Sequence, residues 1–136
     1  MKKRGFGAGK YNGIGGKLEK GETPEEAMLR ETQEEIKITP TEYYKVGEIE
    51  FLEYYKGKRI NLVFHLYLAT DWEGEPTETE EMAPARFDID NIPYDQMFPG
   101  DKHWYPYLLA GKKFNAFFDY DENRNILSYK IEETYQ

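Results

Sequence analysis

The most regular hydrophobic pattern in the chain lies in residues 23–36 and predicts an amphipathic helix. Thr23 is a favourable N-cap, Pro24 occupies the preferred first helical position, and Glu26 completes a Thr-x-x-Glu capping box. Pro40 prevents the helix from continuing much further, because the residue before a proline disfavours helical geometry. On a helical wheel one arc gathers the residues that are predicted to face the core: Met28, Leu29, Thr32 and Ile36.

The other hydrophobic segments are typical of strands. Residues 60–69 are apolar on both faces, which predicts a strand in the centre of a sheet. Residues 113–119 and 124–132 are predicted to pair as a hairpin through a short polar turn. Further strands are predicted at residues 46–55 and, more briefly, at residues 85–89.

Turn residues and charge mark the connections between these segments. The acidic segment 71–81 and the proline-containing segment 92–100 are predicted to be irregular. A second helix is predicted to begin at Trp104 or Pro106 and to end at Ala110, where a glycine follows as its stop. Together these elements predict an α+β fold.

Composition narrows the class of protein. A chain of 136 residues is predicted to form a single domain, residues 1–136, because a second core would leave each half too small. The absence of cysteine excludes disulfides, thiolate nucleophiles and cysteine-based metal sites. No apolar stretch approaches the ~20 residues of a membrane helix, and no apolar leader follows the first basic residues. Because neither a membrane helix nor a leader is indicated, we expect a cytoplasmic protein without a membrane partner. With a net charge of −8, direct binding to nucleic acid is not expected.

Three glutamates, Glu31, Glu34 and Glu35, gather on another arc of the predicted helix. Arg30 can pair with Glu34, which leaves at least two carboxylates crowded together without a partner. This crowding favours a bound cation, and oxygen-only ligands select a hard ion such as Mg²⁺ or Mn²⁺. In the glycine-rich loop before the helix, a main-chain carbonyl such as that of Gly16 could join the ligands. The alternative is an ordinary solvated acidic face.

The spacing of these acids extends into a longer motif. Its members are Gly16, Glu22, Arg30, Glu31, Glu34 and Glu35. They follow the pattern G-x5-E-x7-R-E-U-x-E-E-x-G-U, which resembles the Nudix box. Two positions depart from the pattern, because Thr32 replaces a bulky aliphatic residue and Lys37 replaces a glycine. If the backbone at Lys37 is left-handed, that replacement costs on the order of 1 kcal/mol.

The resemblance continues outside the box. The segments KKRGFGAGKYNGIGGK, KVGEIEF, EEMAPARF, NIPYDQMFPGDKHWYP and KKFNAFF are similar to the MutT class of Nudix hydrolases, which removes oxidised purine nucleotides from the nucleotide pool. The resemblance implies an α/β/α sandwich around a mixed sheet. It also implies Mg²⁺-dependent hydrolysis of a nucleoside triphosphate to a monophosphate and pyrophosphate. Relatives carry a further strand ahead of the position of Lys2, so we expect a sheet that lacks this N-terminal strand, in a monomer or a homodimer.

The resemblance also implies roles for individual residues. The implied metal-site residues are Gly16, Glu31, Glu34, Glu35 and Glu81. Glu31 or Glu35 is the implied general base, and Arg30 belongs to the same catalytic set. Lys2, Lys3 and Lys10 could hold the triphosphate, although loop lysines are often simply solvated.

The implied nucleotide-binding residues are Lys2, Phe6, Asn12, Phe51, Phe98 and Asp101. Among them the pattern changes, since Phe98 replaces a stacking tryptophan and Gly100 replaces the first of two neighbouring acids that read the base edge. With Asp101 alone the two-acid device cannot operate, so a Gly100→Asp substitution is expected to raise the preference for oxidised guanine nucleotides.

Two alternatives remain open from the sequence. The first is a Nudix hydrolase that acts on another nucleoside diphosphate-linked substrate, which the altered base-reading positions would permit. The second is a non-catalytic nucleotide-binding Nudix domain.

Overall fold

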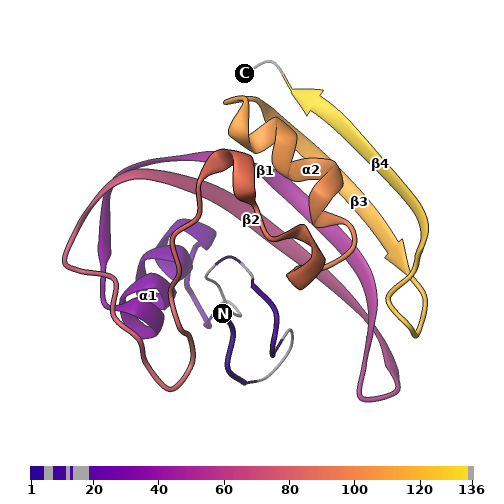
Figure 1. Cartoon of the computed structure of the whole chain (residues 1–136), viewed down its shortest axis with the longest axis horizontal. Coiled ribbons are helices and arrows are strands. Elements are labelled where there is room, and N and C mark those ends of the chain that lie inside the picture. Colours follow the sequence, from indigo (N-terminus) through magenta and orange to yellow (C-terminus); the bar gives the residue numbers. More distant parts are fainter. Residues whose placement is uncertain (5–7, 12, 14–18, 135–136) are drawn as a thin grey trace. The chain divides into compact units, whose positions relative to one another are not determined.

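The computed structural model describes residues 1–4, 8–11, 13 and 19–134, and its elements are labelled in Figure 1. The elements in chain order are α1 (Pro24–Ile36), β1 (Thr39–Tyr55), β2 (Lys58–Glu73), the 3₁₀ turns η1 (Ile89–Asn91) and η2 (Tyr94–Gln96), α2 (Asp101–Leu109), β3 (Lys113–Tyr120) and β4 (Ile126–Thr134). The chain divides into two compact units, the first comprising Met1–Tyr44 with Leu68–Gln96 and the second Lys45–Tyr67 with Met97–Gln136. The single domain stays a prediction, and the two units are described in turn.

Helix α1, in the first unit, begins and ends where local sequence signals place it. The Thr23 hydroxyl accepts a hydrogen bond from the Glu26 amide at 3.1 Å, and the Glu26 carboxylate accepts one from the Thr23 amide at 3.2 Å. At the other end Lys37 is left-handed, with φ of 63°, and its amide donates to the Gln33 carbonyl at 3.1 Å. The predicted capping box is therefore confirmed, and the glycine-like position of the motif does require a left-handed residue.

The buried face of α1 differs from the predicted arc. Thr32 and Ile36 are buried as expected, but Met28 and Leu29 are only half-buried. Their place is taken by two other residues, Ala27 and Glu35. The buried face has thus rotated toward the acidic arc and carries a carboxylate into the protein interior.

The sheet is mixed, as predicted, and its strand order is β2-β1-β3-β4. Strands β1 and β3 are parallel, with Phe51 opposite Phe118, and β3 and β4 are antiparallel. The two-residue turn Lys56-Gly57 joins β1 to β2, and both of its residues have positive φ (52° and 76°), as hairpin turns of this length require. The α+β class is confirmed.

Strand β2 is the main correction in the sheet. The apolar run at residues 60–69 predicted a central strand, but β2 lies at an edge of the described sheet and its Val63 is 49% exposed. The inner positions belong to β1 and β3, because β1 pairs on its other side with β3. Strand β1 also begins at Thr39, earlier than predicted.

Two further predictions need correction, and one is confirmed. Residues 85–89 form no strand, because the segment leads instead into the 3₁₀ turn η1, where Ile89 is 67% exposed. Helix α2 begins at Asp101 rather than at Trp104 or Pro106, so the proline lies inside the helix. The C-terminal hairpin of β3 and β4 is confirmed. Its register runs from Lys113 opposite Thr134 to Tyr120 opposite Ile126.

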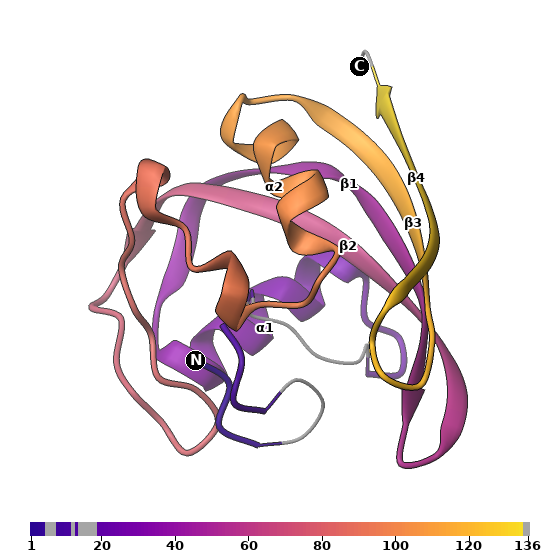
Figure 2. The ribbon, with the colours of Figure 1, turned by 45° about the vertical axis from the view of Figure 1, so that its right-hand side comes forward.

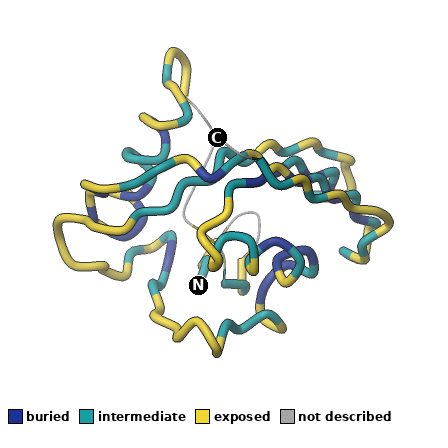
Figure 3. Tube along the Cα trace, turned by 90° about the horizontal axis from the view of Figure 1, so that it is seen from above, coloured by how far each residue is buried: buried dark blue, intermediate teal, exposed yellow. Residues whose placement is uncertain are grey.

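The core of the second unit is aromatic and lies on one face of the sheet. Phe114, Phe118 and Tyr120 of β3 are at most 1% exposed, and the distribution of burial along the chain is drawn in Figure 3. Helix α2 packs on β3 (Figure 2), where Trp104 lies with its ring centroid 6.0 Å from that of Phe114.

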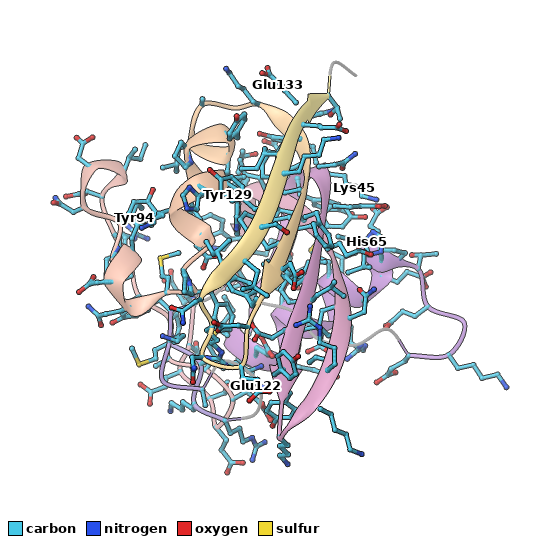
Figure 4. The ribbon with its side chains drawn as sticks, turned by 90° about the vertical axis from the view of Figure 1, so that its right-hand side faces the viewer. Lys45, His65, Tyr94, Glu122, Tyr129 and Glu133 are labelled. Atoms are coloured by element: carbon cyan, nitrogen blue, oxygen red, sulfur yellow. The ribbon has the colours of Figure 1, made fainter. Side chains whose placement is uncertain are left out.

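Tyr129 of β4 belongs to this α2-bearing face, since its ring stacks on Phe118 at 5.6 Å and on His103 at 4.6 Å. Lys45 and His65 project from the other face (Figure 4), with the Lys45 Nζ and His65 Nδ1 atoms 3.2 Å apart. The sheet therefore has one aromatic, helix-covered face and one charged face.

None of the described helices is long and apolar enough to cross a membrane.

Candidate active site

Arg30 organises the carboxylates of α1. Its Nε atom donates to Glu22 at 2.7 Å, and its Nη1 atom donates to Glu31 at 2.8 Å and to Glu34 at 3.1 Å. A guanidinium can serve three carboxylates because it offers five N–H donors in a planar fork. The hydrogen bond from Arg30 lowers the pKa of Glu22, and the hydrogen bonds to Glu22 and Glu31 raise the pKa of Arg30.

Glu35, in the last turn of α1, is nearly fully buried, with an exposed fraction of 4%. Its Oε1 atom lies 3.5 Å from the Nζ atom of Lys2. Its backbone carbonyl accepts a hydrogen bond from the Thr79 hydroxyl at 2.7 Å, and the neighbouring Ile36 carbonyl accepts one from the Thr77 amide at 2.9 Å. The acidic loop is thereby tied to the C-terminal turn of α1.

These contacts correct the prediction that at least two carboxylates would lack a partner. Arg30 holds both Glu31 and Glu34, and Lys2 lies beside Glu35. A helical wheel considers only the residues of the helix itself. It therefore could not reveal Lys2, which comes from the start of the chain.

Glu81 is connected to the same N-terminal segment. Its carboxylate accepts a hydrogen bond from Arg4 Nε at 2.7 Å, and this contact lowers the pKa of Glu81. Its carbonyl accepts from the Lys3 amide at 3.0 Å, and Lys2 forms an antiparallel bridge with Met82. The segment that places Lys2 beside Glu35 is thus fixed against the loop that carries Glu81.

In the second unit, the three predicted nucleotide-binding residues that the structure describes are all buried. Phe51 and Phe98 are each 5% exposed, and Asp101 is 3% exposed. The Phe51 ring stacks on Phe118 at 5.7 Å, and the Asp101 carboxylate accepts a hydrogen bond from Trp104 Nε1 at 3.1 Å. All three belong to the aromatic interior of this unit.

Gly100 lies against the end of Tyr120. Its amide donates to the Tyr120 hydroxyl at 2.8 Å. A Cβ atom at position 100 would lie 2.3 Å from that hydroxyl oxygen and 2.9 Å from the ring of Phe118. The hydroxyl therefore occupies the space that a side chain at position 100 would need.

Comparison with known proteins adds the family to this geometry. The model of the NUDIX domain matches residues 1–108. The chain belongs to the Nudix family. It is 44% identical to the oxidized purine nucleoside triphosphate hydrolase of Danio rerio and 43% identical to that of Mus musculus, in each case over 98% of this chain and 84% of the relative. It is also 47% identical to the 8-oxo-dGTP diphosphatase of Escherichia coli K12, over 51% of this chain and 50% of that protein.

The fold comparison agrees with the family. The crystal structure of the mutator MutT protein from Bacillus halodurans superposes with a TM-score of 0.76 at 27% identity, covering 88% of this chain and 80% of that one. The chain is thus a hydrolase of the Nudix family, with the fold of a MutT protein.

Nudix hydrolases generally use a divalent metal ion, and the donor chemistry of α1 fits one. Its candidate ligands are carboxylate oxygens, which suit a hard divalent ion. Within residues 1–4, 8–11, 13 and 19–134, however, no three Asp, Glu or His side chains converge closely enough to hold a metal. The glutamates instead face Arg30 and Lys2, the cations that a metal ion would have to compete with.

Three predicted residues of this Nudix protein lie outside the described residues. They are Phe6, Asn12 and Gly16. The structure describes the others in two groups. Arg30, Glu31, Glu34, Glu35, Glu81 and Lys2 belong to the first unit, and Phe51, Phe98 and Asp101 belong to the second.

Two buried residues in the same unit as the predicted nucleotide-binding residues Phe51, Phe98 and Asp101 were missed by the sequence analysis, Glu53 and Tyr120. Glu53 is only 2% exposed, and it follows Ile49 and Phe51 at the alternate positions of β1 that are buried. A charged residue in register with buried neighbours was the signal that could have revealed it. Tyr120 had no comparable signal, because its contact with Gly100 joins residues twenty positions apart.

Proposed function

We propose that this Nudix hydrolase cleaves purine nucleoside triphosphates, including those of oxidised purines, to the monophosphate and pyrophosphate in nucleotide-pool sanitation, with Mg²⁺ as its metal and Mn²⁺ as a substitute. The observation that carries the proposal is the set of carboxylates on α1, with Glu35 buried beside Lys2 and Glu31 and Glu34 gathered by Arg30. The near-full-length relatives named as oxidized purine nucleoside triphosphate hydrolases support the substrate class. The proposed role in the nucleotide pool goes with the cytoplasmic location that the sequence predicts.

The residues of α1 divide the work of hydrolysis. Glu31, Glu34 and Glu35, with Glu81, would hold the metal, which when bound offsets the charge of the phosphates and acidifies the attacking water. Glu31 or Glu35 accepts the proton of the attacking water as the water oxygen bonds to phosphorus and the P–O–P bridge between the α- and β-phosphates breaks, which gives the monophosphate and pyrophosphate; this contributes about 10²–10⁴-fold. Arg30 is a positioning residue, because its two contacts fix the direction of the Glu31 and Glu34 carboxylates.

Lys2 supplies the positive charge at this site. Its Nζ atom lies 3.5 Å from Glu35, and its side chain is mostly buried. A protein of net charge −8 repels a triphosphate, so a local cation beside the metal ligands favours substrate binding. Lys3 is less suited to this role, because its Nζ atom is hydrogen-bonded to Glu78, an exposed residue that does not belong to the carboxylates of α1.

A substrate panel with two matched variants tests the proposal. The panel contains dGTP, 8-oxo-dGTP, dATP and dTTP, each with and without Mg²⁺, and release of pyrophosphate and monophosphate is measured. Glu35→Gln is expected to lower turnover by about 10²-fold or more, because it removes a metal ligand and candidate base. Glu78→Gln removes a comparable carboxylate–lysine pair from an exposed site and is expected to leave turnover unchanged.

Two outcomes would contradict the proposal. One is turnover that does not depend on a divalent ion or on Glu35. The other is hydrolysis of a nucleotide sugar or dinucleotide polyphosphate with no activity on any triphosphate, which would favour a different Nudix substrate class.

A further inference from the structure

The second unit contains a buried carboxyl group to which the proposed hydrolysis assigns no role. Glu53 follows Phe51 by two positions on β1, so both side chains lie on the same face of the sheet. The parallel register pairs Phe51 with Phe118 and Leu52 with Asp119, which brings Glu53 to the level of Tyr120. Glu53 is 2% exposed and Tyr120 is 1% exposed.

The carboxyl group of Glu53 is poorly compensated for such a buried position. Among the residues that the structure describes, its one hydrogen-bond donor is the Tyr54 amide, at 3.0 Å from Oε1. The Nε atom of Arg124 forms an ion pair with Oε2 at 3.9 Å, a distance beyond that of a hydrogen bond. Burial accordingly raises the pKa of Glu53, which favours the neutral acid. A leucine of similar size would fill this position at a lower desolvation cost, so packing does not explain the acid.

The surroundings of Glu53 combine aromatic rings with a few polar groups. The ring of Phe51 lies on one side, with the Tyr120 ring stacked on it at 6.0 Å. The guanidinium of Arg124 also lies 4.8 Å from the centroid of Phe98. Flat apolar rings and a small number of hydrogen-bonding groups are the types of side chain that line sites for heterocyclic bases.

We propose that Glu53 is a specificity-determining residue that reads the edge of the purine base, with the Tyr120 hydroxyl beside it. A neutral carboxyl presents one donor and one acceptor side by side. This matches a purine edge on which an acceptor and a donor are adjacent, such as O6 and N1–H of guanine. Position 100 cannot supply this function, because the Tyr120 hydroxyl fills its space. The inference rests on the proposed function and specifies how the base is recognised.

Binding of reaction products tests this role without involving catalysis. Calorimetry with 8-oxo-dGMP, dGMP and dTMP is carried out on the full chain, on Glu53→Leu and on Glu53→Gln. Glu50→Gln is the control, because Glu50 neighbours Phe51 on the same strand and therefore projects from the opposite face. Glu53→Leu is expected to lose about tenfold or more in affinity for both purine monophosphates. Glu53→Gln, which keeps a donor and an acceptor, and Glu50→Gln are expected to retain purine binding.

Thermal unfolding separates this role from a structural one. A base-reading carboxyl that is costly to bury predicts that Glu53→Leu has a Tm equal to or above that of the parent chain, although it binds purines less well. A fall in Tm together with the fall in affinity would instead assign Glu53 to the architecture of the fold, and would overturn the proposal.

The dependence of binding on pH provides a second readout. The neutral form of Glu53 is the binding form, so purine affinity is expected to fall as the pH rises through its raised pKa, and to be flat in Glu53→Gln. The charged or titratable groups that act on Glu53 are Arg124, Arg59 and Asp121, and Tyr120 faces it from β3. A pH profile that is identical in both proteins would contradict the proposal.

The two proposals fail in different ways. If Glu53→Leu binds dGMP and 8-oxo-dGMP as tightly as the parent chain, base reading by Glu53 is wrong, whether or not triphosphates are hydrolysed. If no triphosphate is hydrolysed but purine binding still depends on Glu53, the proposed reaction is wrong and the base-reading role stands.

Discussion

Gly100 shows how a single contact can decide which residue a position accepts. The Tyr120 hydroxyl accepts the Gly100 amide at 2.8 Å and lies 2.3 Å from where a Cβ would stand. The expectation that Gly100→Asp would simply raise the preference for oxidised guanine therefore needs revision. The added side chain must first displace a buried tyrosine, so we expect loss of stability to dominate.

A double-mutant cycle measures this steric conflict. Gly100→Ala is expected to lower the free energy of unfolding by about 1–3 kcal/mol, because the site has no room for a methyl group. Tyr120→Phe removes the hydroxyl and is expected to cost about 1–2 kcal/mol, since the Gly100 amide loses its acceptor. In the Tyr120→Phe background, Gly100→Ala should cost at least about 0.5 kcal/mol less. Urea unfolding gives all four values, and strictly additive values would contradict the steric explanation.

At the scale of the element, α1 combines a favourable start with a strained end. Its capping box satisfies amides at the first turn, while the left-handed Lys37 terminates it where glycine is the residue of lowest cost. The strain is local, because Lys37 is exposed and its amide still bonds to the Gln33 carbonyl.

Substitution at the end of α1 tests this account. Lys37→Gly is expected to raise the free energy of unfolding by about 0.5 kcal/mol, the relief of left-handed strain less the greater chain entropy of glycine. Lys37→Ala is the control, because it removes the charged side chain but keeps the Cβ atom and hence the strain. If both variants have the same free energy of unfolding in urea, the change in stability comes from loss of the lysine side chain and not from relief of backbone strain.

The sequence predicted α1 well because its determinants are local. Thr23, Pro24 and Glu26 act within one turn, and the C-terminal hairpin likewise depends on neighbouring residues. The edge position of β2 was not predictable, since strand order depends on which distant segment pairs with β1. The same limit applied to the site, because the Lys2 contact of Glu35 joins residues 33 positions apart, whereas the Arg30–Glu34 pair follows from helical spacing.

At the scale of the whole molecule, the chain has 26 acidic and 18 basic residues. The two compact units are each built from two separate segments of the chain, and both β1 and β2 contribute residues to each unit. We propose that the molecule nevertheless unfolds as the single domain that its length predicts.

The proposed metal site on α1 leads to a prediction for the stability of the whole molecule, whose net charge is −8. Because the proposed Mg²⁺ site exists only in the folded chain, Mg²⁺ is expected to raise the Tm by several degrees and to keep raising it with the logarithm of its concentration above the Kd, with a stabilisation of about 2.7 kcal/mol at 100 times the Kd. NaCl at equal ionic strength controls for general screening of the −8 charge. Glu35→Gln is expected to remove most of the increase in Tm that Mg²⁺ produces beyond the NaCl control. An equal rise with NaCl, or an unchanged rise in Glu35→Gln, would contradict a metal site on α1.

The close fit between Tyr120 and Gly100 also couples these two positions in any redesign of the protein. A Cβ atom at position 100 would lie 2.3 Å from the Tyr120 hydroxyl, so a side chain is best introduced there together with a shorter residue at position 120. Libraries that vary one of the two positions at a time would therefore miss the combinations that fit, whereas libraries that vary both together would contain them.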